Sequence, residues 1–578
     1  MKYVLDLECN NFLDEVTEIH CIVMKDIETN QVFTDMQDCI EKYKSADTII
    51  GHNIIAFDIK VIEKILNIKT NAKVFDTLVA SRLVWSHIKE YDFKNAHAGF
   101  PKNMIGRHSL EAWGHRLGLH KGQQPLDWKV FTDEMLTYCI QDVEVTHKLY
   151  KTIIKKEYSS NALDLEHSVQ DTCVGMMANG IEFNIKSAQF LFNELNDERI
   201  QLESDLFKFF PPWVEEEEFI PKVNNKTRGY VKGVPFIKRK TIEFNPNSRD
   251  HIAYRLKATR NWKPKEFTPD GKPKVDDDVL SSLNWEEAKL LGRYFMIQKR
   301  LGQLAEGKNA WMKLEINNRI YPGINTNGAV TGRATHSKPN LAQVPSVSAE
   351  YGSECRELFT AKDGCVLVGA DMSQLELRML GHYMFPFDDG DYAREVIDGD
   401  IHTRTLQALE LNADQRPLAK KFIYTFLYGG GAKRIGETMG KTTAEGKQLR
   451  ELFLNKIPAL KILIDRVQSA AAIHGDIKGL DGRRVFVRST HAALNCLLQS
   501  AGAIAAKYWI DNLKEYLTED IRLVGWVHDE IILEVKEDKA EYAKDISIKS
   551  IEDITERAAL RVQLTGESRI GNSWKEIH

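Results

Sequence analysis

The chain has 578 residues and a formal charge of −5 at pH 7, and 43% of its residues are apolar. This length predicts three or four domains or subdomains. The composition is that of a globular protein and excludes collagen-like, low-complexity and disordered classes. The charge excludes a uniformly basic coat around a polyanion, but not a local basic groove on an acidic body.

The eight cysteines are scattered along the chain without a CxxC pair. This pattern predicts neither a disulfide framework nor a structural zinc site, and it indicates a reducing compartment. No segment approaches the roughly 18 consecutive apolar residues of a membrane helix. Asp6 and Glu8 interrupt the apolar N-terminal segment, so we expect neither a signal peptide nor a transit peptide.

The first part of the chain predicts alternating strands and helices. Strands are expected in KYVLDLE, HCIVMKD, VFTDM and DTIIGHN, and helices at 58–67, 76–86 and 133–156. Such alternation is typical of an α/β domain. Residues 160–210 then carry apolar residues at helical spacing.

Residues 211–246 interrupt this helical pattern. They begin with two prolines and four consecutive glutamates, and Lys and Arg then recur over 222–240 with no acid between them. We expect a loop or small hairpin that projects from a helical subdomain. Taken alone, it fits either a solvated loop or a basic docking segment.

The remaining elements complete a mixed α/β and α+β chain. Helices are expected at 249–259 and 276–313, strand-rich turns to about 350, a buried strand at 365–371, and a largely helical stretch to about 475. Hairpins are expected around Asp481-Gly482 and at 522–535, on either side of a helix at 491–516.

A first set of carboxylates lies in the N-terminal α/β region. Asp6 and Glu8 are two residues apart on a strand, so their side chains leave the same face and repel each other unless a cation lies between them. Asp58 opens a helix, and Tyr138 and Asp142 share a helix face. Four carboxylates and a tyrosine suit a two-metal phosphodiester hydrolase in which the tyrosine orients water. The acidic pair alone also fits an exposed strand.

These motifs, DLE, HNIIAFD and YCIQD, resemble those of the DEDD-type 3′→5′ proofreading exonucleases with tyrosine in the third motif. The resemblance implies an RNase H-like fold and metal binding by Asp6, Glu8, Asp58 and Asp142.

A second pair of carboxylates lies far apart in the sequence. Asp371 ends the strand CVLVGAD, and Asp529 lies at the tip of a hairpin in His528-Asp529-Glu530. If the two ends converge on one sheet surface, they would hold Mg²⁺ with positions left for phosphates, as phosphoryl transfer requires. Each aspartate taken alone also fits an ordinary turn residue.

Between these aspartates, Arg416, Lys420, Tyr424 and Tyr428 follow one another at intervals of four residues. On a helix this spacing forms one slowly spiralling stripe. Its two cations can bind a triphosphate, and its two aromatic rings can stack on bases. The alternative is an amphipathic helix with core tyrosines. Gly429 to Gly431 are expected to end the helix.

The motifs DMSQLELR, RPLAKKFIYTFLYG and HDE, in that order, resemble the three polymerase motifs of the family A DNA polymerases. TGRATHSKPNLAQVP, GDIHTRT and GLDGRRVFVRSTHAALNCLLQSAGA extend the resemblance. Within that family the chain most resembles the replicative polymerases of T-seven-like podophages, over nearly its whole length.

The resemblance implies an exonuclease joined to a right hand of palm, fingers and thumb. The expected domains are the exonuclease at 1–155, the thumb and connecting helices at 156–330 with a short basic insertion at 211–241, the first palm part at 331–382, the fingers at 383–494, and the second palm part at 495–578.

The same resemblance implies the site roles. Asp371, Asp529 and the carbonyl of Met372 would hold two metal ions. The expected nucleotide-binding residues are His402, Arg416, Lys420, Tyr424 and Glu376, with Lys420 assisting the leaving group and Glu376 excluding ribonucleotides. The expected DNA-binding residues are Arg333, Tyr428, Asn495, Gln499 and His528.

The expected cofactor is Mg²⁺, two ions per active site, with Mn²⁺ as a substitute. The expected partners are primer-template DNA, dNTPs, a phage helicase-primase and a single-strand binding protein, in the cytoplasm of an infected bacterial host. The thumb insertion that captures thioredoxin in the phage enzymes is short here, so we do not expect thioredoxin to raise processivity. Lys238, Arg239 and Lys240 are instead expected to contact duplex phosphates.

Two other functions fit parts of the pattern. A single-subunit RNA polymerase would share the palm aspartates and the Arg and Lys of the helix, but Glu376 and the exonuclease motifs argue against it. A DNA-binding scaffold with a decayed site is disfavoured because every expected carboxylate is present at both sites.

Overall fold

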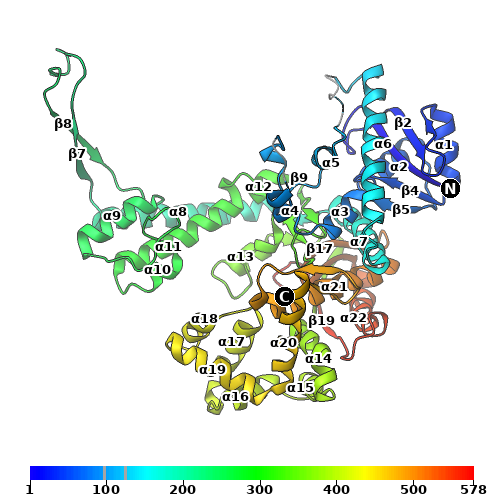
Figure 1. The fold of residues 1–578 in the computed structure, drawn as a ribbon. Coiled ribbons are helices and arrows are strands. Elements are labelled where there is room, and N and C mark those ends of the chain that lie inside the picture. Colours follow the sequence, from blue (N-terminus) through cyan, green and yellow to red (C-terminus); the bar gives the residue numbers. More distant parts are fainter. Residues whose placement is uncertain (96–98, 121, 123–126) are drawn as a thin grey trace. The chain divides into compact units, whose positions relative to one another are not determined.

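The computed structural model describes residues 1–95, 99–120, 122 and 127–578. Within them the chain forms two compact units (Figure 1). The larger unit consists of Met1–Glu182, Tyr321–Val347 and Phe359–His578, and the smaller unit of Phe183–Ile320 and Ser348–Leu358. None of the described helices is long and apolar enough to cross a membrane.

A five-stranded sheet opens the larger unit, in the order β3-β2-β1-β4-β5. β1 is antiparallel to β2 and parallel to β4. The strands are β1 (Lys2–Cys9), β2 (Ile19–Asp26), β3 (Val32–Phe33), β4 (Thr48–Gly51) and β5 (Lys73–Asp76). The four expected strands are confirmed. The short β5 is an addition, since its four residues are too few to show a periodicity.

Helices cover both faces of this sheet. The odd-numbered residues of β1, such as Leu5 and Leu7, pack against α1 and α2, whereas Val4 packs against α5 and α6. The even-numbered face then becomes acidic at Asp6 and Glu8. The helices are α1 (Met36–Ser45), α2 (Asp58–Leu66), α3 (Thr77–Val84), α4 (Ile88–Asn95), α5 (Leu110–Leu117) and α6 (Asp133–Ile154).

A second, antiparallel sheet forms the base of the C-terminal part of the larger unit, in the order β17-β18-β14-β19. Its strands are β14 (Cys365–Met372), β17 (Ile521–Val527), β18 (Glu530–Lys536) and β19 (Gly566–Gly571). The predicted hairpin at 522–535 is β17–β18. Helices α21 (Ala493–Leu513) and α22 (Ala540–Arg557) pack together beside the sheet within the largest apolar core.

The stretch between β14 and α21 is largely helical, as predicted. Its helices are α14 (Leu375–Asp388), α15 (Asp391–Asp398), α16 (Ile401–Ala408), α17 (Arg416–Leu427), α18 (Ala432–Thr438), α19 (Thr443–Lys456) and α20 (Pro458–His474). The predicted hairpin around Asp481 is formed by β15 (Asp476–Lys478) and β16 (Arg484–Phe486).

A buried ionic cluster ties α7 (Ser160–Asn179) to this C-terminal part. Arg483 donates to Glu166 of α7 at 2.7 Å and to Asp481 at 2.9 Å, and Lys507 of α21 also contacts Glu166. All four side chains are at most 2% exposed. In the division into compact units, α7 belongs to the larger unit.

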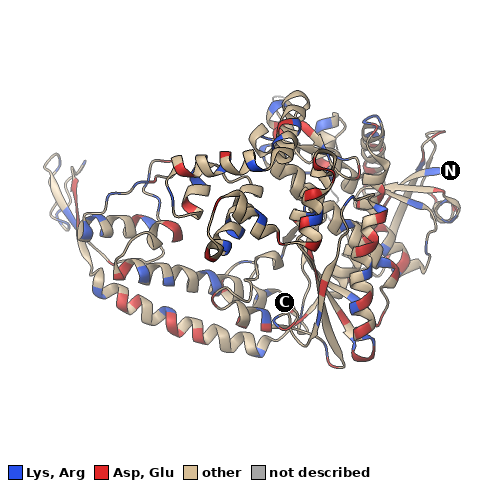
Figure 2. Cartoon of the chain, turned by 90° about the horizontal axis from the view of Figure 1, so that it is seen from below, with Lys and Arg blue, Asp and Glu red and all other residues tan. Residues whose placement is uncertain are grey.

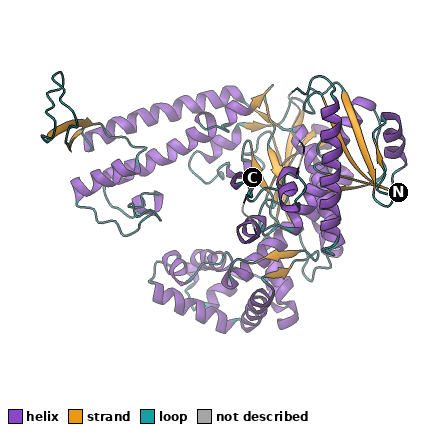
Figure 3. Cartoon of the chain, turned by 45° about the horizontal axis from the view of Figure 1, so that its top comes forward, coloured by secondary structure: helices purple, strands orange, loops and turns teal. Residues whose placement is uncertain are grey.

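The smaller unit is mainly helical, and its helices α8 and α11 run side by side (Figure 3). Its elements include α8 (Ile185–Phe209), α9 (Arg249–Arg260), α10 (Asp277–Ser281), α11 (Glu286–Leu301) and α12 (Trp311–Leu314). The single helix expected at 276–313 is thus broken, and the π-helical turn Gly302–Glu306 follows α11. Short strands complete the two units: β6 (Ile181–Phe183), β9 (Glu315–Ile316), β10 (Arg319–Ile320), β11 (Gly323–Asn325), β12 (Thr335–Ser337) and β13 (Phe359–Thr360).

Residues 213–242 of the smaller unit form the hairpin expected there, with strands β7 (Trp213–Phe219) and β8 (Phe236–Ile242). Its register sets glutamates opposite cations: Glu215 faces Lys240, Glu216 faces Arg239, and Glu217 faces Lys238. Arg239 forms an ion pair with Glu216 at 2.7 Å. Figure 2 shows both charge signs on this hairpin. The cations expected to bind phosphates therefore already face acids within the protein.

The ionic cluster predicts that substitution of two adjacent arginines will change the free energy of unfolding by very different amounts. Arg483→Met leaves buried carboxylates with less compensation and should lower the free energy of unfolding by about 3–5 kcal/mol. Arg484→Met removes an exposed partner of Asp476 and should change it by less than about 1 kcal/mol. Urea denaturation followed by tryptophan fluorescence measures both, and equal effects would contradict the structural role of the cluster.

Candidate active sites

The C-terminal sheet brings Asp371 and Asp529 together. Asp371 lies opposite Glu530 in the pairing of β14 with β18, and the backbone N–H of Met372 donates to the carbonyl of Asp529 at 3.0 Å. His528 takes a positive φ of 59° in the turn, a conformation that makes the β17–β18 connection tight. The pairing of β14 with β18 therefore holds Asp371 and Asp529 together at one edge of the sheet, as the sequence analysis anticipates.

Burial and neighbouring carboxylates disfavour the charged form of both carboxyl groups. Burial, followed by the charge of Asp529, raises the pKa of Asp371 to about 7. Burial, followed by the charge of Glu376, raises the pKa of Asp529 to about 6. A divalent cation relieves this repulsion, and carboxylate oxygens are the ligands that Mg²⁺ prefers. The residues present therefore fit a metal site.

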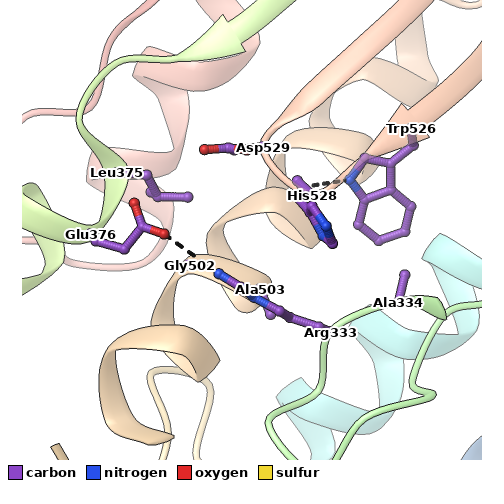
Figure 4. A pocket seen from close by; sticks show the side chains of 9 residues that line it. All are labelled: Arg333, Ala334, Leu375, Glu376, Gly502, Ala503, Trp526, His528 and Asp529. Atoms are coloured by element: carbon purple, nitrogen blue, oxygen red, sulfur yellow. Dashed lines mark hydrogen bonds and ion pairs between the residues drawn. The ribbon is translucent and has the colours of Figure 1, made fainter. Parts of the chain in front are cut away.

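A pocket opens beside Asp529 (Figure 4). Arg333 and Glu376 approach each other across it, with 3.5 Å between Nη2 and Oε1. Gly502 and Ala503 of α21 line one wall and leave room, since they carry no bulky side chain. The lining residues are Arg333, Ala334, Leu375, Glu376, Gly502, Ala503, Trp526, His528 and Asp529.

Helix α17 presents the predicted stripe on its open face. Arg416 and Lys420 are exposed and Tyr424 is half-buried, while the opposite face buries Ala419 and Phe422. Pro417 lies in the first turn of the helix, where the missing N–H does no harm. The helix ends at Leu427, just before the glycines, as expected. The stripe is therefore open at Arg416, Lys420 and Tyr428, whereas Tyr424 packs partly against the apolar core.

The two tyrosines of the stripe connect it to the pocket. Their rings are nearly parallel, with centroids 6.4 Å apart, and the hydroxyl of Tyr428 donates to Oε1 of Glu376 at 2.9 Å. Burial and then the charge of Glu376 raise the pKa of Tyr424, with Asp529 adding to the effect. Tyr424 also lies against His402 of α16, with 6.1 Å between ring centroids. The stripe thus ends beside the carboxylates of Glu376 and Asp529.

The remaining predicted residues lie around the same end of α17. The side-chain amide of Asn495 donates to the carbonyl of Leu427 at 3.0 Å, and Gln499 follows Asn495 by four residues on α21. Burial, followed by the positive charge of Arg333, lowers the pKa of His528. Arg333 and His528 line the pocket, and Asn495 and Gln499 share one face of α21.

Sequence reasoning does not single out Asp400, which binds Arg416 and caps the helix that carries His402. Its carboxylate caps α16 by accepting from the backbone N–H of His402 at 3.0 Å, and it accepts from Nε and Nη2 of Arg416 at 2.8 and 2.9 Å. The hydrogen bond from Arg416 lowers the pKa of Asp400. The sequence feature that could identify Asp400 is its position immediately before a helix, because aspartate is a preferred N-cap residue.

The N-terminal sheet forms the second site. Asp6 and Glu8 project from β1 toward α6, and their oxygens lie within 4.8 Å of each other and of the Cys139 sulfur. Asp58, at the start of α2, is buried, and burial raises its pKa to about 7, with further contributions from Asp76 and Asp142. Asp58 and Asp142 therefore belong to the same electrostatic environment, although they lie outside that close group of ligand atoms.

Tyr138 and Asp142 lie on α6 as predicted, and both are buried. The Tyr138 ring packs edge-on against Trp128, with 6.0 Å between centroids. Cys139, between them, is the residue that sequence reasoning passes over, although it precedes Asp142 by three positions and so shares its side of the helix.

Comparisons with known proteins agree with this arrangement. The model of DNA polymerase family A matches residues 225–576. The chain is 35% identical to the DNA-directed DNA polymerase of Enterobacteria phage T3 and 34% identical to that of Escherichia phage T7, each over the full length of both chains. It is 28% identical to DNA polymerase I of Aquifex aeolicus, over 91% of this chain and 88% of the relative. The chain therefore belongs to DNA polymerase family A.

Proposed function

We propose that this chain is a template-directed DNA polymerase that replicates phage DNA and proofreads it with a 3′→5′ exonuclease. The observation that carries the proposal is the meeting of Asp371 and Asp529 beside the end of the α17 stripe. Family membership and the phage relatives support it. The substrates would be primer-template DNA and dNTPs.

In the polymerase site, Asp371, Asp529 and the carbonyl of Met372 would hold two divalent ions, Mg²⁺ or Mn²⁺ in its place. When bound, the ions supply charge neutralisation for an in-line phosphoryl transfer. His402, Arg416 and Lys420 would bind the triphosphate, and Lys420 would donate a proton to the leaving pyrophosphate. These residues act by positioning and electrostatic stabilisation.

The residues around the pocket would set which substrate fits. Tyr424 would pack on the incoming nucleotide, and Glu376 would exclude its 2′-hydroxyl by an unfavourable contact. Tyr428, Arg333, Asn495, Gln499 and His528 would contact template and primer. Contacts in the minor groove distinguish base identity poorly, which suits a replicative enzyme.

In the exonuclease site, Asp6, Glu8, Asp58 and Asp142 would hold the metal ions, and the Tyr138 hydroxyl would orient the attacking water. We assign the exonuclease to 1–155, the thumb and connecting helices to 156–330, the palm to 331–382 and 495–578, and the fingers to 383–494. A phage helicase-primase and a single-strand binding protein are the further partners that we propose, in the cytoplasm of the infected bacterial host.

The two activities should be separable by mutation. Asp529→Ala should abolish primer extension with dNTPs and leave single-strand degradation intact, because each carboxylate pair holds its own metal ions. Asp6→Ala combined with Glu8→Ala should do the reverse. Both variants are assayed for extension and degradation with Mg²⁺. Loss of both activities in one folded variant would refute the two-site assignment, and extension by wild type with rNTPs but not dNTPs would indicate an RNA polymerase.

Asp400 should orient the Arg416 side chain for binding of the triphosphate. Asp400→Asn keeps a helix cap but loses the ion pair, so KM for dNTPs should rise roughly two- to fivefold, the size of one exposed ion pair, with kcat nearly unchanged. Asp391→Asn, which breaks the neighbouring pair with Arg404, is the matched control and should leave KM unchanged. A lower KM in Asp400→Asn would instead mean that Asp400 withholds Arg416 from the substrate.

The tip of the β7–β8 hairpin, rather than its stem, should contact DNA. Lys222, Lys226, Arg228 and Lys232 are exposed in a segment without acids, whereas the stem cations face glutamates. The packing of Tyr230 on Phe219 and Phe236 orders this tip, with ring centroids 5.3 and 4.9 Å apart. The tip therefore carries positive charge that the hairpin itself does not compensate.

Neutralising the four tip cations to glutamine should weaken binding to duplexes of any sequence. The slope of log K against log salt should flatten by about one unit per lost phosphate contact. Fluorescence anisotropy at several salt concentrations measures the slope. Neutralising Lys238, Arg239 and Lys240 is the control and should change it less. If the tip variant binds DNA as wild type does, the tip serves another partner or none.

A further inference from the structure

The N-terminal site contains a thiol that donates a hydrogen bond to one of the predicted metal-binding carboxylates. Helix α6 places the thiol of Cys139 against the acidic end of β1, with 3.6 Å between Sγ and Oδ2 of Asp6. One oxygen of Asp6, one of Glu8 and this sulfur all lie within 4.8 Å of one another. Cys139 is fully buried, and its sulfur also lies against the thiol of Cys21, which faces Glu8 from β2. These three atoms face a common point between β1 and α6.

The spacing of these atoms matches a ligand set around a small, thiophilic cation. In a tetrahedral zinc site, Zn–S is about 2.3 Å and Zn–O about 2.0 Å, which sets the distance between a sulfur and an oxygen ligand at about 3.5 Å. The hydrogen bond from Cys139 to Asp6, at 3.6 Å, already holds sulfur and oxygen close to this separation, so a cation can replace the thiol proton without a large movement of either side chain. Mg²⁺ takes oxygen ligands in octahedral geometry, whereas thiolate favours zinc and softer metals.

We propose that Asp6, Glu8 and Cys139 form a mixed oxygen and sulfur site that binds a thiophilic divalent cation such as Zn²⁺ or Cd²⁺. Binding releases the thiol proton to solvent and forms a metal–sulfur bond. Because Asp6 and Glu8 are also ligands in the proposed exonuclease, the thiophilic cation competes there with Mg²⁺. That consequence rests on the proposed function, but the binding itself does not.

The polymerase site provides an internal contrast. In the part of the chain that the structure describes, the group at β1 and α6 is the one set of three ligand atoms of this kind this close together. Cys365 lies at the opposite end of β14 from Asp371, so the polymerase carboxylates have no thiol from that strand beside them. A thiophilic cation should therefore act preferentially on degradation and not on synthesis.

The test is absorption spectroscopy of the full chain titrated with Cd²⁺, whose bond to thiolate gives a charge-transfer band in the ultraviolet. Wild type should develop the band at stoichiometric Cd²⁺. Cys139→Ser should lose it, and Glu8→Gln should bind Cd²⁺ at least roughly tenfold more weakly. Asp529→Asn and Cys365→Ser are the matched controls and should keep the band. Primer extension by Cys139→Ser, at the other site, verifies that the variant is folded.

A second measurement follows the consequence for degradation. The Zn²⁺ concentration that halves the exonuclease rate, with each protein normalised to its own rate in Mg²⁺ alone, should rise at least roughly tenfold in Cys139→Ser. A band that survives in Cys139→Ser, or no band in wild type, would overturn the proposed site. Absence of any degradation in Mg²⁺ would refute the proposed exonuclease and leave the spectroscopic result to decide the metal site.

Discussion

Repulsion between carboxylates that the backbone holds close together is the constraint on which both sites depend. At the C-terminal sheet, the antiparallel ladder and one hydrogen bond from Met372 to Asp529 fix the ends of two strands, so Asp371 and Asp529 cannot separate. At the N-terminal sheet, the two-residue period of β1 points Asp6 and Glu8 to the same side. Repulsion disfavours the charged forms of such groups, burial adds to the effect at Asp371 and Asp529, and a cation between the oxygens relieves it.

The surrounding structure supplies the stability that this repulsion removes. Both sheets are covered by apolar cores, and the largest core lies around β14, β18 and α21. The cluster of Glu166, Asp481, Arg483 and Lys507 ties the helix that follows the N-terminal domain to α21 and the β15–β16 hairpin. Because these charges are buried in matched pairs, they fix the geometry of the connection more than they add to stability.

Features with a clear period or a strong local signal could be predicted from the sequence. The alternation in β1, the four-residue spacing along α17, the glycines after it, and the two C-terminal hairpins all appear where local patterns place them. Local rules suffice in these cases because backbone geometry alone decides which residues share a face.

Features that depend on tertiary contacts could not be predicted. Arg416, the partner of Asp400, lies sixteen residues later in the sequence, on another helix. Asp6, the neighbour of Cys139, lies far earlier in the sequence, on the first strand. The basic segment near 222–240 indicates a charged surface, but only the register of β7 with β8 shows which cations already face glutamates. Sequence composition counts charges, whereas strand pairing decides which of them remain available.

The same distinction explains how a chain with a net charge of −5 can serve a polyanionic substrate. Some of its acidic residues face cations within the protein, as in the hairpin stem. Others lie in the two sites, where bound divalent cations would attract phosphate. The cations of α17 and the hairpin tip lie on open surfaces. Electrostatic attraction falls off within about 10 Å at ordinary ionic strength, so DNA responds to these local surfaces and not to the total charge.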